Sequence, residues 1–282
     1  MRRGAALALL LAAAALATVA RGRLTGLESG AGGGGRDLLY LPNGKHLKAM
    51  SLGHAPLAAD LVYLWAIQYY SDYAREDRFR FVEHVFGSVI ADLDPAYVDP
   101  YWLGAMILTV EARDLDAGLR VLDKGFANNP TAWVLPYLAG FECYRVKDYD
   151  RAAVYFDRAS RAPGAPAFTL RMEAGIRAKK GDLRESIRLW EEVLQDPRGD
   201  PASRAIAERQ IRDLAIRADL ADLGAAVAAF REREGGFPRS IETLVRAGFL
   251  RSVPKDPDGN PYLYDPATGR AAPRAGGVLA AM

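Results

Sequence analysis

The sequence predicts an all-α protein, a solenoid of helical hairpins that carries a small C-terminal α+β appendage. One pattern of small and large residues recurs every 34 residues between residues 113 and 197. Within each copy the apolar residues are three or four positions apart, which is the spacing of one face of a helix. After residue 235 the chain becomes rich in Gly, Pro and Asp, which are turn residues, so a differently built end is expected there.

The composition favours a folded protein without bulk charge. Of the 282 residues, 50% are apolar and 26% are charged, which is enough apolar surface for a large core. Lys and Arg number 37 against 35 Asp and Glu, and this balance argues against a nucleic-acid binder that works by net charge. The single cysteine, Cys143, excludes an intrachain disulfide and any cysteine-cluster metal site.

The N-terminus has the pattern of an export signal. Arg2 and Arg3 precede an uncharged run over 4–20 that is mostly Ala and Leu, with the small residues Thr18 and Ala20 at its end. We therefore expect 1–20 to be a secretory signal peptide or an uncleaved signal anchor. The chain is then exported and periplasmic, either free or tethered to the inner membrane. Residues 21–56, with four consecutive glycines, are expected to be a flexible tether and an irregular lead-in.

Three segments, 113–130, 147–163 and 180–197, carry the repeat, and each ends in proline. We expect their small residues to mark close approach of two paired helices and their large residues to fill the gap to the next pair. The residues that recur at the period are Leu115, Tyr149 and Leu183; small Gly118, Ala152 and Ser186; large Leu122, Phe156 and Trp190; and Gly125, Ala159 and Val193.

Acidic residues are expected to cap the second helix of each pair, because a side-chain oxygen can accept from the free backbone N–H groups there. The candidates are Asp114 or Asp116, Asp148 or Asp150, and Asp182. The remaining helices are expected over 57–73, 81–94, 101–111, 133–144, 168–179 and 202–218.

A 34-residue period of helix, turn and helix resembles the tetratricopeptide repeat. The resemblance covers 57–218, with Met106 and Glu173 departing from the small or apolar pattern, and the block 39–70 resembles a group of exported bacterial repeat proteins. In tetratricopeptide proteins the first helix of each pair lines a concave groove. The resemblance therefore implies a partner-binding groove made of Tyr69, Tyr73, Leu103, Ile107, Tyr137, Phe141, Tyr144, Arg145, Arg171 and Lys179. For aromatics such as Tyr137 and Phe141, packing between repeats is an equal alternative.

The segment 219–282 has its own pattern. We expect a helix over 220–234, a short helix capped by Ser240, a turn at 256–259 and a short strand at 262–264. This order resembles part of the soluble region of type II secretion pseudopilins. The matching residues are Gly236, Pro238, Gly248, Leu250, Pro254, Asp256, Pro257, Gly259, Pro261 and Tyr262. A pseudopilin has a long apolar helix directly before this region, whereas this chain has the repeats, so the segment indicates a small module and not a pilin subunit.

Motifs for chemistry are missing from the sequence. There is no Gly-x-Ser-x-Gly elbow and no phosphate-binding loop, and Asp256, Asp258 and Asn260 fit a β-turn better than a calcium loop. The sequence therefore predicts no enzyme, no cofactor and no metal. It favours a non-enzymatic scaffold of the bacterial cell envelope that binds a protein or peptide partner. The alternatives are an accessory factor of a type II secretion or type IV pilus-like machine, an envelope hydrolase with an unrecognised site, and an array that only self-associates.

Overall fold

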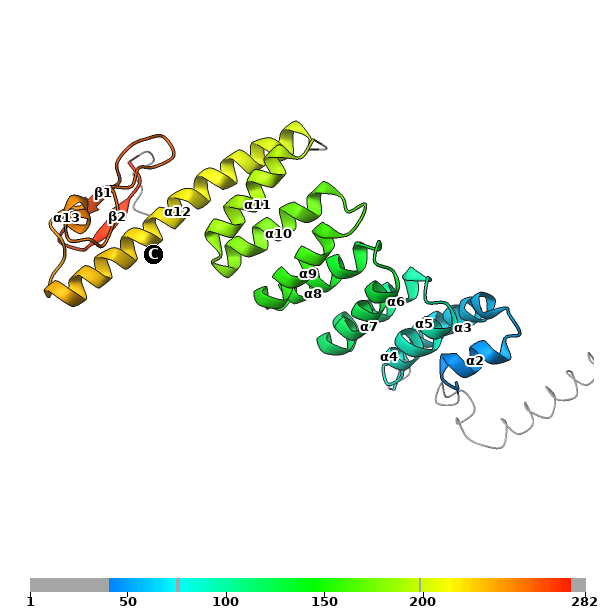
Figure 1. Cartoon of the computed structure of the whole chain (residues 1–282). Coiled ribbons are helices and arrows are strands. Elements are labelled where there is room, and N and C mark those ends of the chain that lie inside the picture. Colours follow the sequence, from blue (N-terminus) through cyan, green and yellow to red (C-terminus); the bar gives the residue numbers. More distant parts are fainter. Residues whose placement is uncertain (1–40, 75–76, 198, 275–282) are drawn as a thin grey trace, which may run out of the picture. The chain divides into compact units, whose positions relative to one another are not determined.

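The computed structural model describes residues 41–74, 77–197 and 199–274 (Figure 1). The expected signal and most of the expected tether lie outside these residues. Helices dominate the described chain, and its one sheet has two short strands, which confirms the predicted fold class. The chain divides into two compact units between Leu93 and Asp94, and each unit is described by itself.

The described part of the N-terminal unit contains a helix where an irregular lead-in was expected. Asn43 caps this helix, because its Oδ1 accepts from the backbone N–H of Lys45 at 2.9 Å. Gly44 allows a close approach, since a Cβ there would lie 2.3 Å from the carbonyl oxygen of Val89. The elements are α2 (Gly44–Met50), α3 (Ala55–Tyr70), α4 (Val82–His84), the π-helix η2 (Val85–Ile90) and α5 (Ala91–Leu93). The helix predicted over 81–94 is thus formed in three consecutive pieces.

The C-terminal unit continues with helical hairpins. Its helices are α6 (Val98–Met106), the π-helix η3 (Ile107–Glu111), α7 (Leu115–Asn128), α8 (Val134–Arg145), α9 (Tyr149–Arg161), α10 (Ala167–Lys180), α11 (Leu183–Gln195), α12 (Pro201–Glu234) and α13 (Ile241–Arg246). The helices α7, α9 and α11 begin at Leu115, Tyr149 and Leu183, so the 34-residue period of the sequence is the period of the structure.

Small residues stand where helices touch, as predicted. A Cβ on Gly118 of α7 would lie 2.3 Å from Thr109 Cγ2 of η3. On α11 the hydroxyl of Ser186 donates to the carbonyl oxygen of Ala174 on α10 at 2.6 Å. The large residues at the next positions, Leu122, Phe156 and Trp190, are all buried. The repeat is therefore a packing pattern, in which close helix pairs are joined by large side chains.

The turns inside the hairpins also repeat. Arg113, Lys147 and Gly181 all have a positive φ, and they are 34 residues apart. Asp114 and Asp148 cap the following helices as expected, at 2.9 and 3.0 Å from the capped nitrogens. The expected cap at Asp182 is wrong: its side chain makes no capping hydrogen bond and instead lies 3.6 Å from both Arg177 and Lys180.

The C-terminal part is built on one long helix. Separate helices were expected over 202–218 and 220–234, but α12 runs unbroken from Pro201 to Glu234. Residues 202–234 contain no proline, and their single glycine, Gly224, lies within the second expected helix, so no helix-stopping residue separates the two. The boundary drawn between 218 and 219 therefore falls inside α12.

A short helix and a hairpin pack on the last turns of α12. Strands β1 (Leu263–Asp265) and β2 (Arg270–Ala272) pair antiparallel, with Tyr264 opposite Ala271. The cores formed with α12 contain Leu223, Val227, Ile241, Leu244 and Tyr262. Ser240 precedes α13 but makes no capping hydrogen bond to it, so that expectation is wrong.

Candidate functional site

The first helices of the C-terminal unit carry an exposed aromatic and basic surface. Phe141 on α8 is 41% exposed, and Lys179 on α10 is exposed as well. The Lys179 Nζ lies 5.7 Å from the ring centroid of the half-buried Tyr144, so a cation–π contact joins α8 to α10. Two residues of the predicted groove, Tyr144 and Lys179, are thereby brought together, and Phe141 lies three residues before Tyr144 on the same helix.

Arg145 links two repeats. Its Nη2 donates to the carbonyl oxygen of Thr109 on η3 at 3.1 Å and to Oε2 of Glu142 at 2.7 Å. Glu142 is buried, whereas the Arg145 side chain is 45% exposed. Arg145 therefore satisfies a buried carboxylate and still presents part of its guanidinium group at the surface.

Tyr137 packs between repeats. Its ring lies 5.4 Å from that of Phe168, 5.8 Å from Phe156 and 6.0 Å from Trp133, measured between centroids. The T-shaped contacts with Phe168 and Trp133 are the favourable geometry for aromatic pairs. For this residue the packing alternative describes the structure, whereas Phe141 points to the surface.

The other predicted groove residues are divided between core and surface. In the C-terminal unit Ile107 is buried, Leu103 is half-buried, and Arg171 donates to the hydroxyl of Ser203. In the N-terminal unit Tyr69 is buried, whereas Tyr73 is 77% exposed and stacks under the guanidinium group of Arg78.

Sequence reasoning missed several exposed apolar residues. Trp102 on α6 and Val110 on η3 are 42% and 43% exposed. On α3, Leu57, Leu61 and Leu64 are all more than half exposed. Their spacing of four and three residues is that of one helix face, so the pattern alone could not tell an outer stripe from a core stripe.

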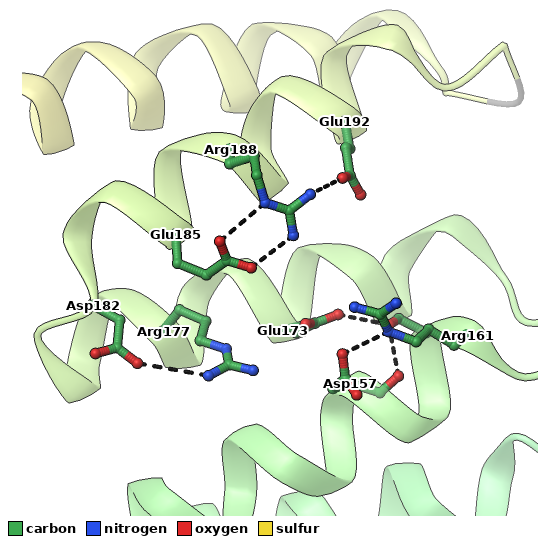
Figure 2. Close-up of polar contacts among 9 residues, drawn as sticks. Asp157, Arg161, Glu173, Arg177, Asp182, Glu185, Arg188 and Glu192 are labelled. Atoms are coloured by element: carbon green, nitrogen blue, oxygen red, sulfur yellow. Dashed lines mark hydrogen bonds and ion pairs between the residues drawn. The ribbon is translucent and has the colours of Figure 1, made fainter.

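A second feature lies between α9, α10 and α11, and Figure 2 shows polar side chains around it. It is a pocket of about 210 Å³ whose polar lining includes Ser160, Arg161, Glu173, Arg188 and Glu192. Glu173 is 1% exposed and accepts from the hydroxyl of Ser160 at 2.6 Å. Burial raises the pKa of the Glu173 carboxyl. Among the described residues its Oε1 has no hydrogen-bond partner.

The two arginines at this pocket are already engaged. Arg161 Nε lies 2.6 Å from Asp157 on its own helix. Arg188 donates to Glu185 at 2.9 and 2.6 Å and also pairs with Glu192 (Figure 2). Arg188 and the Nε of Arg161 are thus directed at neighbouring carboxylates. On α10, two buried atoms remain without a hydrogen-bond partner among the described residues, Glu173 Oε1 and Arg177 Nε.

The residues considered for chemistry have structural roles. Cys143 is buried, and burial raises the pKa of its thiol to about 12, so it is not a thiolate nucleophile at neutral pH. Asp256 accepts from the backbone N–H groups of Asp258 and Asn260 at 3.0 and 2.8 Å and thereby holds a turn. Across residues 41–74, 77–197 and 199–274 there is no group of three or more potential metal ligands. In the same residues no helix is both long and apolar enough to span a bilayer.

Fold and surface together define a tetratricopeptide-like helical-repeat protein. No protein-family model matches the chain, and no curated protein gives a significant match. Solved structures similar to it include "MamA 41-end from Desulfovibrio magneticus RS-1", at 16% identity and a TM-score of 0.38, covering 57% of this chain and 85% of that one. The "MamA RS-1 ArsTM double mutant" has 16% identity and a TM-score of 0.36, covering 55% and 93%. A third structure, "Crystal structure of MamA", has 15% identity and a TM-score of 0.34, and the match covers 52% of this chain and 90% of that one. The repeat fold of this chain rests on its own helices and their period.

Proposed function

We propose that this protein is a non-enzymatic scaffold that binds a protein or peptide through the first helices of its C-terminal unit. The observation that carries the proposal is the surface formed by Phe141, Tyr144 and Lys179. These side chains remain at the surface of an array whose cores are closed by other residues. Aromatic side chains are enriched in the cores of protein interfaces, so Phe141 and Tyr144 carry the proposal, and Lys179 adds a positive charge beside them.

The proposed setting is the bacterial cell envelope. It is supported by the basic and apolar pattern of residues 1–20 and by the glycine-rich stretch that follows. Cell fractionation of a C-terminally tagged chain tests it. Export predicts protection from cytoplasmic labelling reagents, and deletion of residues 4–20 is expected to leave the chain in the cytoplasm. Recovery of the intact chain in the cytoplasm would contradict the setting.

Binding is tested by quantitative capture of interacting proteins from source-cell extracts. The test variant is Phe141→Ser combined with Lys179→Glu, and the matched control is Val154→Ser, because Val154 on α9 is 50% exposed. We expect one partner to be captured by wild type and control and to fall at least tenfold with the double variant, with circular dichroism unchanged. Equal capture of the partner by all three chains would refute the proposal that this surface binds it.

A second candidate function is an accessory factor of a secretion or pilus-like machine. The favouring observation is the C-terminal module, in which α13, the Asp256 turn and the β1–β2 hairpin follow one another and pack on α12. This order is that of the pseudopilin-like motif in the sequence. Capture of pilin-type proteins by the full chain would support it, provided that Leu263→Asp, a change at a 51% exposed residue of the hairpin, abolishes that capture.

A further inference from the structure

The pocket between α9, α10 and α11 arises from two departures from the repeat. At the position of Glu173, the two preceding repeats have Ala105 and Ala139, and both are fully buried. At the position of Ser160, the neighbouring repeats have Phe126 and Leu194. Ser160 thus stands where the neighbouring repeats have a large apolar side chain, which leaves space between the helices. Glu173 stands where the preceding repeats have alanine, and it places a carboxyl group beside that space.

The burial of Glu173 is costly for the fold. A buried carboxyl without full hydrogen bonding destabilises the folded state, because its charged form loses hydration. Ser160 supplies one hydrogen bond to Oε2, at 2.6 Å, and Oε1 has no partner in the described part of the chain. A repeat that needed only packing would keep alanine here. The carboxyl is therefore the feature of the pocket that calls for a ligand.

The walls of the pocket are apolar. Pro166, Ala167, Leu170 and Leu189 line it beside the polar groups. A volume of about 210 Å³ is smaller than the usual site for a drug-sized molecule and has the scale of one long side chain. Apolar walls with a carboxyl among them suit an alkyl chain that ends in a polar group, which is how lysine side chains are commonly accommodated.

The charge of the pocket selects a cation. The charged lining residues are Arg161, Arg188, Glu173 and Glu192. Arg161 is paired to Asp157, and Arg188 is paired to Glu185 and Glu192, so among the described residues Glu173 is the lining charge without an ion pair. Arg188 already directs Nε, Nη1 and Nη2 at carboxylates, which leaves it poorly placed to bind an anion. Arg177, on the same helix as Glu173, is directed at Asp182 (Figure 2).

We propose that this pocket binds the side chain of a lysine from a protein partner. The lysine methylenes lie against Leu170 and Leu189, and the ammonium group donates to Glu173 Oε1. The proposal extends the proposed function, because it names the chemistry of a second contact with a protein partner. It concerns a different place on the molecule from the surface around Phe141.

Binding is coupled to a proton. The Ser160 hydroxyl has one hydrogen but lies 2.6 Å from Glu173 Oε2 and 3.0 Å from the carbonyl oxygen of Asp157. Ser160 therefore shares its hydrogen between the two acceptors and satisfies Glu173 only in part. Burial raises the pKa of the Glu173 carboxyl, and an arriving ammonium group favours the ionised form, so binding lowers this pKa and releases to solvent the proton of a protonated carboxyl. The charged groups around it are Asp157 and Arg161 on α9, Arg177 on α10, and Arg188 and Glu192 on α11.

The test uses the full chain and the probe Nα-acetyl-lysine methylamide, followed by calorimetry and by NMR of the labelled Glu173 carboxyl. We expect saturable binding that strengthens with pH and releases protons into the buffer. The Nζ-acetylated probe, which has no charge, is expected to bind at least tenfold more weakly. The variants Glu173→Gln and Ser160→Leu, the second of which fills the pocket, are expected to lose at least tenfold in affinity. Glu208→Gln on the exposed side of α12 serves as the control and is expected to bind like wild type.

Three results would overturn the proposal. They are no saturable binding of the probe, equal binding of its Nζ-acetylated form, and binding that occurs only in Arg177→Gln. The last result would show that Arg177 is the internal partner of Glu173. Phe141→Ser is expected to leave probe binding unchanged. The experiment can therefore refute the pocket proposal without refuting partner binding at the surface around Phe141, and the reverse.

Discussion

At the scale of single residues, two aspartates in equivalent places have different roles. Asp148 accepts from the backbone N–H of Arg151 at 3.0 Å and from its Nε at 2.6 Å, and these hydrogen bonds lower the pKa of Asp148. Asp182 occupies the same repeat position but makes no capping bond. The backbone angles of the two residues are similar, and the difference is that the Asp182 side chain lies beside Arg177 and Lys180. Position in the repeat therefore identifies a candidate cap, while the neighbouring side chains decide whether the cap forms.

Replacing Asp148 by Ala is expected to destabilise the fold by about 1 kcal/mol, because a capping bond is lost. Asp182→Ala is the matched control and is expected to cost less than half as much. Urea unfolding followed by circular dichroism measures both. Equal losses would show that the two aspartates act through general charge and not through capping.

Glu173 provides a test of pH dependence. Because the pKa of its carboxyl is raised in the folded chain, the folded state binds more protons than the unfolded state above the ordinary glutamate pKa of about 4.3. Wild type therefore loses stability as the pH rises from that value through the raised pKa. We expect Glu173→Gln to match wild type near pH 4 and to be more stable at pH 7 to 8.

The control for this experiment is Glu185→Gln, for which the sign is reversed. Hydrogen bonds from Arg188 lower the pKa of Glu185, so its stabilising effect is present above the ordinary pKa and is lost in acid. Unfolding midpoints at several pH values measure both trends. A Glu173→Gln chain that is less stable than wild type at pH 7 would contradict the account of a buried, unsatisfied carboxyl.

At the scale of helices, some glycines are needed because a neighbouring helix packs against them, whereas others are not. A Cβ on Gly125 of α7 would lie 2.6 Å from the Tyr101 ring of α6, whereas a Cβ on Gly175 of α10 would meet nothing within 4 Å. Gly125→Ala is expected to destabilise by about 1–3 kcal/mol, since it overpacks a helix contact. Gly175→Ala is expected to stabilise by up to about 1 kcal/mol, since alanine favours helix. Thermal unfolding measures both changes in stability. If both variants were stabilised or both destabilised, the close contact between Gly125 and Tyr101 would be refuted as the cause.

The helices of the repeat could be predicted because their period, small residues and large residues all report the same packing. The start of α2 was missed because one residue, Asn43, provides the cap in a segment otherwise rich in turn residues. The continuity of α12 was missed because its apolar residues change partners along the helix. Ala207 and Leu214 pack with the repeat helices, whereas Leu223 packs with the C-terminal module. The pieces of 81–94 include a π-helix, for which the sequence offers no signal of its own.

At the scale of the molecule, the repeats are expected to stabilise one another as neighbours. Phe156 is fully buried on α9 and its ring lies 5.8 Å from that of Tyr137 on α8. Phe156→Ala is expected to cost about 3–5 kcal/mol. Hydrogen exchange is expected to show the largest loss of protection in α8–α10 and a smaller loss in the β1–β2 hairpin. A loss confined to α9 would contradict neighbour stacking.

The candidate surface could be predicted only in part. The period assigns residues to first helices, but it does not tell which of them face a neighbour, and so Tyr137 and Ile107 are packed while Phe141 and Lys179 are exposed. The Glu173 pocket escaped prediction because it depends on two departures from the repeat, Ser160 and Glu173, which stand on consecutive helices and meet only when these helices pack.

The most direct test of the central claim is site-specific photo-crosslinking in the source cell. A photoreactive amino acid is placed at Phe141 and, as the control, at Val154 on α9, which is exposed to a similar degree. We predict one discrete crosslinked protein from position 141 that is missing from position 154 and that disappears when Lys179 is changed to Glu. Crosslinks of equal pattern from both positions, or none from position 141, would contradict a scaffold that binds its partner on this surface.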